Sequence, residues 1–309
     1  MQPNCSQITS ALTEIQKLKV FFDALLVKGQ TAPNTNTSLS LLNQAEAIQR
    51  ELEIRLSNFR EQIIPLEFRQ LIAKEQTTLS QFFGQSVDVP ESPKAVTREL
   101  FKFWESIGFE LHYLPQAEMT LDKNFPGWLK KPGKWFYDQI QGNNIAKDSA
   151  TLKGEWVLVD GRPKPTYQNG DQMYANDPLS PILTKLRKKK SLLKSERDIE
   201  DYRHKGSRFN VSNDELQSAP VKTALAELLR TTPGDLSLPR AIEWNVLGNL
   251  HHPEWGDTTT WEWFQDERKG GGRLSGGRSD VGGLSVVSSN SSGYRDGYLG
   301  FRPLVRFSK

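Results

Sequence analysis

Cysteine is almost absent from this chain of 309 residues, in which Cys5 is the only one. A single thiol can form neither an intrachain disulfide nor a thiolate cluster, so a disulfide-stabilised scaffold is excluded. Long apolar runs are also missing, because no segment approaches the roughly 18 apolar residues that a membrane-spanning helix needs. The first five residues lack the basic and apolar regions of a signal peptide. These absences predict a cytoplasmic protein without a membrane span.

A large excess of one sign of charge is also missing, since 40 Lys and Arg residues oppose 37 Asp and Glu residues, for a formal net charge of +3. That balance is too even to predict a nucleic-acid partner for the whole chain. The densest basic run, 185–190, opens a charged stretch at 185–208 in which acidic residues are mixed with basic ones. The mixture favours a solvated helix face. A phosphate-binding patch stays open as an alternative, although no aromatic side chains are interleaved for base stacking.

The first 85 residues carry the periodicity of amphipathic helices. Apolar residues at three- and four-residue spacing predict one helix over Ile8–Val27 and a second that begins at Ser38 and ends before Pro65. Leu66–Phe83 continues the same pattern. We therefore expect a helical hairpin or three-helix unit at 1–85, packed on itself. The alternative is that these helices also assemble the chain into a homo-oligomer.

A second unit is expected at 92–309, after a linker at 87–93 that contains two prolines. Helical spacing is present at Ala95–Ile107 and at Asn213–Leu229, where Ser212 or Asn213 is the expected N-cap. These helices are combined with short aromatic segments that Gly and Pro interrupt. Gly154–Val159 is the clearest strand among them. The mixture of helices and strands predicts the α+β class.

Three short motifs follow one another in the last part of the chain. They are Leu238–Trp244, with the sequence LPRAIEW, then Trp261–Trp263, with the sequence WEW, and finally Gly300–Arg302, with the sequence GFR. Their order resembles the formylglycine-generating-enzyme-like branch of the C-type-lectin-like fold. This resemblance implies a lectin-like fold for 92–309.

The same resemblance bears on catalysis. The oxidising enzymes of that family hold copper through a pair of cysteines, and this chain has no cysteine after Cys5. No other recognisable nucleophile motif is present. We therefore expect a binding protein that is not an enzyme, without catalytic residues, cofactor or metal. A formylglycine-generating-enzyme-like protein with another activity and a nucleic-acid-associated protein remain the alternatives.

Gly and Ser dominate the segment between the second and third motifs. Such composition is typical of flexible loops, but apolar residues recur in the segment and could attach it to a core. They are Leu274, Leu284, Val286, Val287 and Leu299. The interleaved Ser, Gly, Asn and Tyr residues are typical of antibody contact loops, where Tyr supplies rigid contact area and the small residues adapt. The composition therefore favours a supported contact surface.

The residues that frame this segment, Arg273–Leu274, Gly282–Leu284 and Leu299–Val305, resemble the constant framework of target proteins of diversity-generating retroelements. Those elements copy a template with errors at adenines, so altered Asn codons never yield Lys, Glu, Gln, Met or Trp. None of these five types occurs between Arg273 and Arg306. The resemblance implies a variable region at about 273–298 that contacts an unknown protein or other macromolecular ligand. The candidate contact residues are Ser275, Arg278, Ser279, Asp280, Ser288, Ser289, Asn290, Ser291, Ser292, Tyr294, Arg295, Asp296 and Tyr298.

Other chemical signals are weak. Gly270–Ser279 is rich in glycine but lacks the Gly-Lys-Ser/Thr ending of a phosphate-binding loop. His251 and His252 stand close to two acidic residues, Glu254 and Asp257. Because adjacent side chains point to different sides of a helix or strand, we expect turn or surface roles for these histidines rather than a shared metal site.

Overall fold

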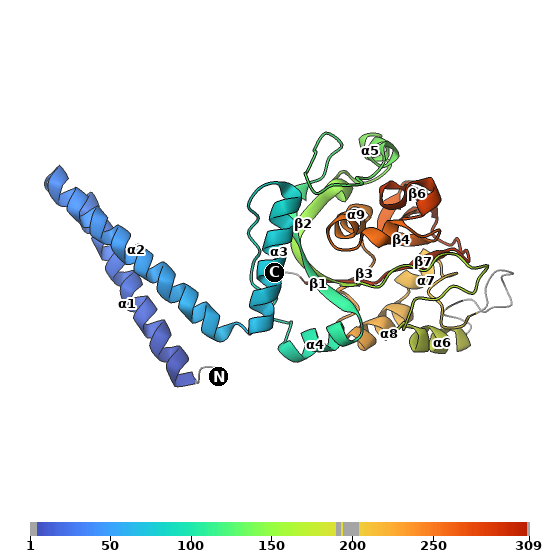
Figure 1. Ribbon diagram of the computed structural model, residues 1–309, viewed down its shortest axis with the longest axis horizontal. Helices are drawn as coiled ribbons and strands as arrows, with labels where there is room; N and C mark the ends of the chain where they lie inside the picture. The colour runs from blue at the N-terminus through green and yellow to red at the C-terminus, as the bar shows by residue number, and fades with distance from the viewer. Residues whose placement is uncertain (1–4, 190–192, 194–203, 308–309) are drawn as a thin grey trace. The chain divides into compact units, whose positions relative to one another are not determined.

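The structure is a computed structural model that describes residues 5–189, 193 and 204–307 (Figure 1). The chain divides into two compact units, Met1–Ala73 and Lys74–Lys309. This division falls inside the helix α3, Leu66–Phe83, and so lies earlier than the predicted linker at 87–93. The second half of α3 therefore belongs to the C-terminal unit.

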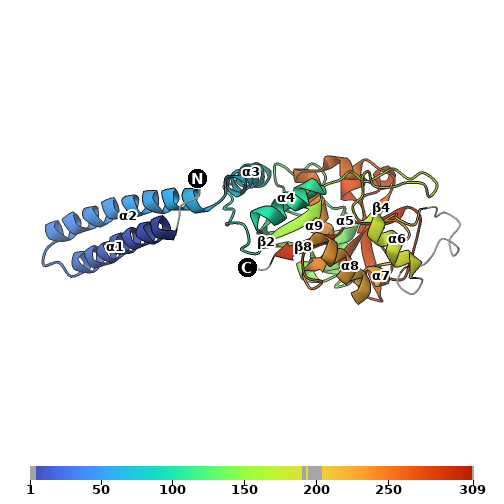
Figure 2. The same cartoon turned by 90° about the horizontal axis from the view of Figure 1, so that it is seen from below.

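The N-terminal unit is helical, as predicted. Its helices α1, Cys5–Gln30, and α2, Thr35–Ile63, pack against each other as a hairpin (Figure 2). Leu25 and Ala45 are buried between them. Among the described helices, none is long and apolar enough to cross a membrane.

The second helix begins earlier than its predicted start at Ser38. The side chain of Asn34 accepts a hydrogen bond of 2.9 Å from the backbone N–H of Thr37, which satisfies a free amide of the first turn. The Ser38 hydroxyl instead donates to the Gly29 carbonyl oxygen, at 2.7 Å. Ser38 thus ties the end of one helix to the next rather than capping its own helix.

The C-terminal unit combines helices with two four-stranded sheets, which confirms the α+β class. Its further helices are α4 Arg98–Ser106, α5 Lys134–Gln141, α6 Ser180–Lys188, α7 Asn213–Gln217, α8 Ala219–Leu229 and α9 Ala241–Leu250. Its strands are β1 Phe109–Glu118, β2 Thr151–Asp160, β3 Leu236–Ser237, β4 Trp261–Arg268, β5 Gly272–Gly276, β6 Val287–Ser291, β7 Leu299–Phe301 and β8 Leu304–Phe307.

The first sheet has the order β1-β2-β8-β3 and is antiparallel throughout. The second has the order β6-β5-β4-β7, in which only the β4–β7 pair is parallel. The helix α9 touches strands of both sheets, and β1 and β2 curve around one side of it (Figure 1). Every residue from Ala241 to Asn249 is buried, so α9 is the centre of the core.

The predicted single helix over Asn213–Leu229 is two helices, α7 and α8, separated at Ser218. Pro220 is the second residue of α8. Because a proline is tolerated only in the first turn of a helix, a new helix begins at Ala219. The predicted cap at Ser212 is confirmed. Its hydroxyl accepts from the Glu215 backbone N–H, while the Glu215 carboxylate accepts from the backbone N–H of Ser212.

Candidate ligand-binding surface

The three sequence motifs meet in one place. The strand of the second motif, β4, pairs in parallel with β7, so that Glu262 lies opposite Gly300 and Trp263 opposite Phe301. The helix of the first motif is α9, which packs against β4. Segments far apart in the chain therefore form one continuous core.

The carboxylate of Glu262 joins the motifs through buried polar contacts. It accepts a hydrogen bond of 2.6 Å from the indole N–H of Trp244 and forms a 3.0 Å ion pair with Arg302. It also accepts from the hydroxyl of Tyr174. Burial alone would raise the pKa of Glu262, but the charges of Arg302 and Lys164 outweigh burial and lower it. Each motif thus contributes one charged or indole group to a satisfied buried cluster.

Arg302 satisfies its remaining donors on the other side of this cluster. Its guanidinium donates to the backbone carbonyl oxygens of Asp160 and Arg162 and lies 3.8 Å from the ring centre of Trp255. Its side chain is fully buried. The arginine therefore links the end of β2 to the second sheet.

Lys164 attaches the candidate variable segment to the core. Its ammonium nitrogen donates to the carbonyl oxygens of Thr260, at 2.7 Å, and Gly277, at 2.9 Å. Burial lowers the pKa of Lys164 to about 7, although Glu262 acts in the opposite direction. The backbone directly after β5 is thus fixed by a hydrogen bond from a buried side chain that lies far away in the chain.

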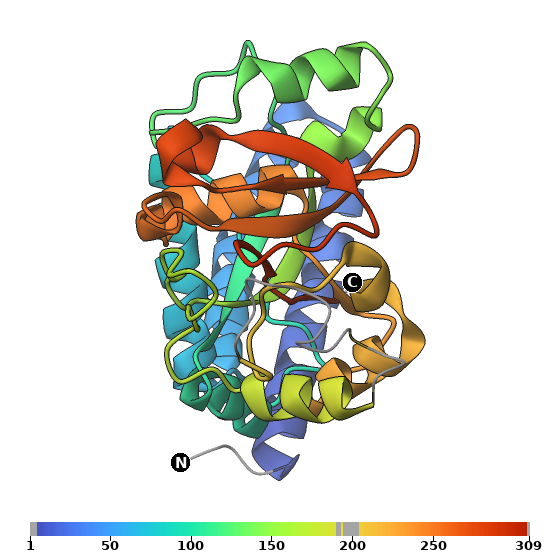
Figure 3. The ribbon, with the colours of Figure 1, turned by 90° about the vertical axis from the view of Figure 1, so that its right-hand side faces the viewer.

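Three of the five predicted apolar anchors of the segment are confirmed, whereas Val286 and Val287 are only half-buried. Leu274, Leu284 and Leu299 are all buried. Leu284 fills the space that Gly248 and Gly256 leave open, because a Cβ atom on either glycine would lie only 2.6 Å and 2.8 Å from its side chain. β6 forms the edge of the sheet beyond β5 (Figure 3). The segment is therefore attached to the core and contributes β5 and β6 to the second sheet.

One predicted contact residue is misplaced. Ser275 is fully buried on β5, and its hydroxyl oxygen accepts a hydrogen bond of 3.0 Å from the side-chain amide of Asn290. The remaining candidates keep at least part of their surface accessible, and Asp280 and Ser291 are exposed. Strand alternation alone would turn Ser275 away from the face of Leu274, but β5 has both faces covered along Leu274–Gly276.

The structure brings the two ends of the variable segment together. The guanidinium of Arg278 lies 5.5 Å from the ring centre of Tyr298, close enough for a cation–π contact. The same guanidinium binds both carboxylate oxygens of Asp280, at 2.7 and 2.8 Å. This ion pair is only partly buried, so its groups can still reach a ligand.

A tyrosine cluster continues this surface. The Tyr294 hydroxyl donates to the carboxylate of Asp296 at 2.6 Å and lies 3.4 Å from the hydroxyl of Tyr298. The Tyr298 ring contacts Tyr167 edge to face, with centroids 6.1 Å apart. We define Tyr167, Arg278, Asp280, Tyr294, Asp296 and Tyr298 as the tyrosine–arginine surface. Tyr167 had no sequence signal for this role, because it lies on a segment remote in the chain.

Arg295 differs from the other candidate contact residues because it forms an ion pair with another helix. Its guanidinium pairs with Glu215 at 2.9 Å, and Glu215 is also the acidic partner in the cap of α7. Burial would raise the pKa of Glu215, but Arg295 and Ser212 lower it. Arg295 therefore fastens the turn after β6 to α7, and its guanidinium is already engaged.

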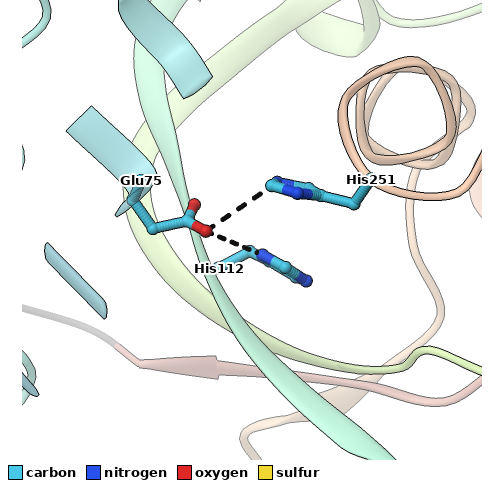
Figure 4. A group of neighbouring side chains, drawn as sticks. All are labelled: Glu75, His112 and His251. Carbon is cyan, nitrogen blue, oxygen red and sulfur yellow. Dashed lines mark hydrogen bonds and ion pairs between the residues drawn. The ribbon is translucent and has the colours of Figure 1, made fainter. Parts of the chain in front are cut away.

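His251 and His252 lie in the turn that ends α9, in agreement with one predicted role, but the predicted surface position is wrong. Both side chains are more than nine-tenths buried, beside Glu75, Glu110 and His112 (Figure 4). Burial lowers the pKa of His112, but hydrogen bonds to Glu110 and Glu75 outweigh it and raise that pKa to about 9. The sequence spacing did not indicate this cluster, because its members come from α3, β1 and the end of α9.

The charged stretch 185–208 is not a uniformly solvated face where it is described. Arg187 is buried and donates to the carbonyl oxygens of Ser207 and Phe209. Arg208 is buried between the carboxylates of Asp160 and Asp177. The rest of the predicted basic patch includes exposed Lys185, Lys188 and Lys189, whereas 190–192 and 194–203 lie outside the described residues.

The chain matches no protein-family model, curated protein or solved structure with which it was compared. The arrangement of its own side chains is therefore what supports a functional proposal. Its described C-terminal unit offers a surface of polar and aromatic groups that a buried framework supports.

Proposed function

We propose that this chain is a cytoplasmic, non-enzymatic binding protein with a C-type-lectin-like C-terminal unit. In this proposal a diversity-generating retroelement varies the surface at 273–298, which contacts a protein or other macromolecular ligand. The observation that carries the proposal is that buried anchor residues and accessible contact residues alternate within that segment. The anchors Leu274, Leu284 and Leu299 are buried, whereas every candidate contact residue except Ser275 keeps accessible surface. Side chains on such a surface can change without disturbing the core.

The tyrosine–arginine surface has the chemistry of a binding site. Tyr and Arg are over-represented among the residues that dominate interface energies, where truncation of one such side chain costs about 2 kcal/mol or more. Tyr294 and Tyr298 hold each other and Asp296 in place, so little conformational entropy is lost when a ligand binds. The small residues Ser288–Ser292 lie on and beside the edge strand β6, where they can adjust the fit.

The retroelement hypothesis has a direct genomic test. We expect a near-copy of the codons for residues 271–301 close to a reverse transcriptase gene, with mismatches confined to adenines of the template. A locus without such a copy, or mismatches spread over all four bases, would remove diversification from the proposal. It would leave the binding role to be tested by itself.

The binding role can be tested with a displayed library in which Ser289, Ser291, Tyr294, Asp296 and Tyr298 are randomised. We expect most members to remain folded, since these side chains lie outside the core. Selection against an unrelated folded protein should then yield binders that lose affinity when the selected residues revert. A matched library at Leu274, Phe264, Leu284 and Leu299, all buried, should mostly unfold. Equal folding in the two libraries would contradict the proposed division between surface and framework.

We also propose that the N-terminal hairpin joins two copies of this chain. Val20, Phe21 and Val27 on α1 and Leu39 and Ile54 on α2 remain exposed although the helices pack together. Association of two such faces would bury apolar surface worth about 25 cal/mol per Å².

The mass of the full chain in light scattering tests this association. Phe21→Glu should shift the mass toward that of one chain. Gln16→Glu, which adds the same charge at an exposed position of α1, should leave the mass of the assembly unchanged. A wild-type chain that is already monomeric at high concentration would refute the association.

A further inference from the structure

A cluster of histidine and glutamate side chains lies in the C-terminal unit and uses none of the residues of the tyrosine–arginine surface. Glu75 comes from α3, Glu110 and His112 come from β1, and His251 and His252 follow one another at the end of α9. The His112 and His251 rings stack with centroids 3.9 Å apart, as Figure 4 shows. The ligand atoms of Glu110, His112 and His252 all lie within 4.8 Å of one another.

Two histidines of this cluster are oriented in the same way. Nδ1 of His112 lies 3.0 Å from a carboxylate oxygen of Glu75, and Nδ1 of His252 lies 3.1 Å from one of Glu254. A histidine that binds a metal through one ring nitrogen usually donates the N–H of the other to a carboxylate, which fixes its tautomer. In both residues a carboxylate holds the proton on Nδ1, so Nε2 is the nitrogen that would bind a metal ion in place of a proton.

Both Nε2 atoms face the same carboxylate oxygen. Oε2 of Glu110 is 3.1 Å from Nε2 of His112 and 3.3 Å from Nε2 of His252. Around a tetrahedral zinc ion with bonds of about 2.0–2.1 Å, neighbouring ligand atoms are about 3.3–3.4 Å apart. Both separations from the Glu110 oxygen are therefore close to those between ligands of one ion, and the two nitrogens lie within 4.8 Å of each other.

One of these nitrogens has no hydrogen bond of its own. Nε2 of His252 is buried, and among the residues that the structure describes it has no hydrogen-bond partner, although it points at Glu110. An orphaned buried acceptor is costly unless something binds it. The carboxylates of Glu75 and Glu110, 3.0 and 3.1 Å from the ring nitrogens of His112, favour a cation electrostatically.

We propose that Nε2 of His112, Nε2 of His252 and the carboxylate of Glu110 bind a divalent transition-metal ion of the zinc type. Imidazole and carboxylate ligands suit zinc, and two histidines with one glutamate leave a fourth position for water. The Glu110 side chain is 43% exposed, which provides a route from solvent to the site. Glu75 and Glu254 are positioning residues that hold the two imidazoles.

The neighbouring group of Glu75, His112 and His251 is less suited to the ion. Glu75 is fully buried, and its second oxygen already accepts a hydrogen bond from the backbone N–H of Tyr113. Nε2 of His251 lies 3.8 Å from Glu75, and its ring is stacked on that of His112. We therefore assign His251 a packing role beside the site rather than a ligand role.

Zinc titration of the untagged full chain, freed of metal with a chelator, tests the site. Isothermal calorimetry should give one Zn²⁺ per chain for the wild type. Glu110→Gln should weaken binding by more than about 100-fold, beyond the about 10–100-fold losses typical of residues that only position ligands. Glu254→Gln should fall within that smaller range. Glu118→Gln is the matched control, because it removes the same charge from an exposed position of the same strand.

Co²⁺ supplies a second readout that a purely structural role would not affect. The wild type and Glu118→Gln should show the intense visible absorption of four-coordinate Co²⁺, and Glu110→Gln should lose it. Circular dichroism should show that all three variants stay folded, because Glu110 and Glu254 are each 40% or more exposed. Absence of stoichiometric Zn²⁺ binding, or equal affinities for Glu110→Gln and Glu118→Gln, would overturn the proposal.

Discussion

Removal of the buried charge at Glu262 should destabilise the C-terminal unit more than any change on its surface. Glu262→Gln conserves the shape of the side chain but leaves the guanidinium of Arg302 without its ionic partner in a fully buried position. The indole N–H of Trp244 and the hydroxyl of Tyr174 also depend on this carboxylate. The substitution therefore weakens the point at which the three motifs meet.

The size of the expected loss of stability follows from the burial of the Glu262–Arg302 ion pair. Both side chains are 0% exposed, and loss of one partner from such a pair costs about 3–5 kcal/mol because the other charge remains buried and uncompensated. In a unit of this size, each kcal/mol lowers the melting temperature by about 2–4 °C. The melting temperature should thus fall by roughly 6–20 °C.

Urea unfolding followed by tryptophan fluorescence measures this effect, because Trp244 is part of the cluster. The control is Glu267→Gln on the same strand, whose side chain is 63% exposed and pairs with Arg273 at 3.4 Å. Its cost should stay below about 1 kcal/mol. Arg302→Met combined with Glu262→Gln should destabilise by less than the sum of the single changes, with a coupling of about 1–3 kcal/mol. Equal costs for Glu262→Gln and Glu267→Gln, or strict additivity, would refute the reasoning.

Further predictions concern the variable segment and its support. Ser275→Arg should lower the free energy of unfolding by at least about 1–3 kcal/mol through overpacking, whereas Ser291→Arg should change it by less than about 0.5 kcal/mol in chemical unfolding. Leu284→Ala should cost about 2–5 kcal/mol and weaken any ligand selected on the surface, as calorimetric melting and binding would show. Burial lowers the pKa of Lys164 from 10.5 to about 7 in the native state, so between these values the unfolded chain holds a proton that the native state lacks. The free energy of unfolding should therefore rise with pH, by about 1.4 kcal/mol per pH unit more than in Lys164→Met. Urea midpoints measured for both proteins at several pH values test this, and an equal pH dependence would contradict it.

The elements that the sequence predicted well are those whose signal is local. The helix at Leu66–Phe83 has its predicted bounds, the cap at Ser212 is in place, and the predicted strand Gly154–Val159 lies within β2. Side-chain periodicity and capping act within a few residues, so they survive in any tertiary context. The α+β class follows from the same local signals, whereas the lectin-like fold and the retroelement remain predictions.

The errors concern residues whose surroundings come from elsewhere in the chain. Ser275 has the composition of a surface residue, yet the neighbouring strands cover it. Arg208 looked like part of a solvated charged stretch, but Asp160 and Asp177 receive it in the interior. Composition does not indicate burial when the compensating partner lies many residues away.

By itself the sequence determined the helical character of the N-terminal unit, the mixture of helices and strands after it, and the polar segment framed by apolar anchors. The tertiary structure alone decided which of those polar side chains remain accessible. It also placed Glu110, His112 and His252 around a common point. The physical reason is that periodicity acts along the chain, whereas an ion-binding geometry or a contact surface is made by side chains that meet only after the core has packed.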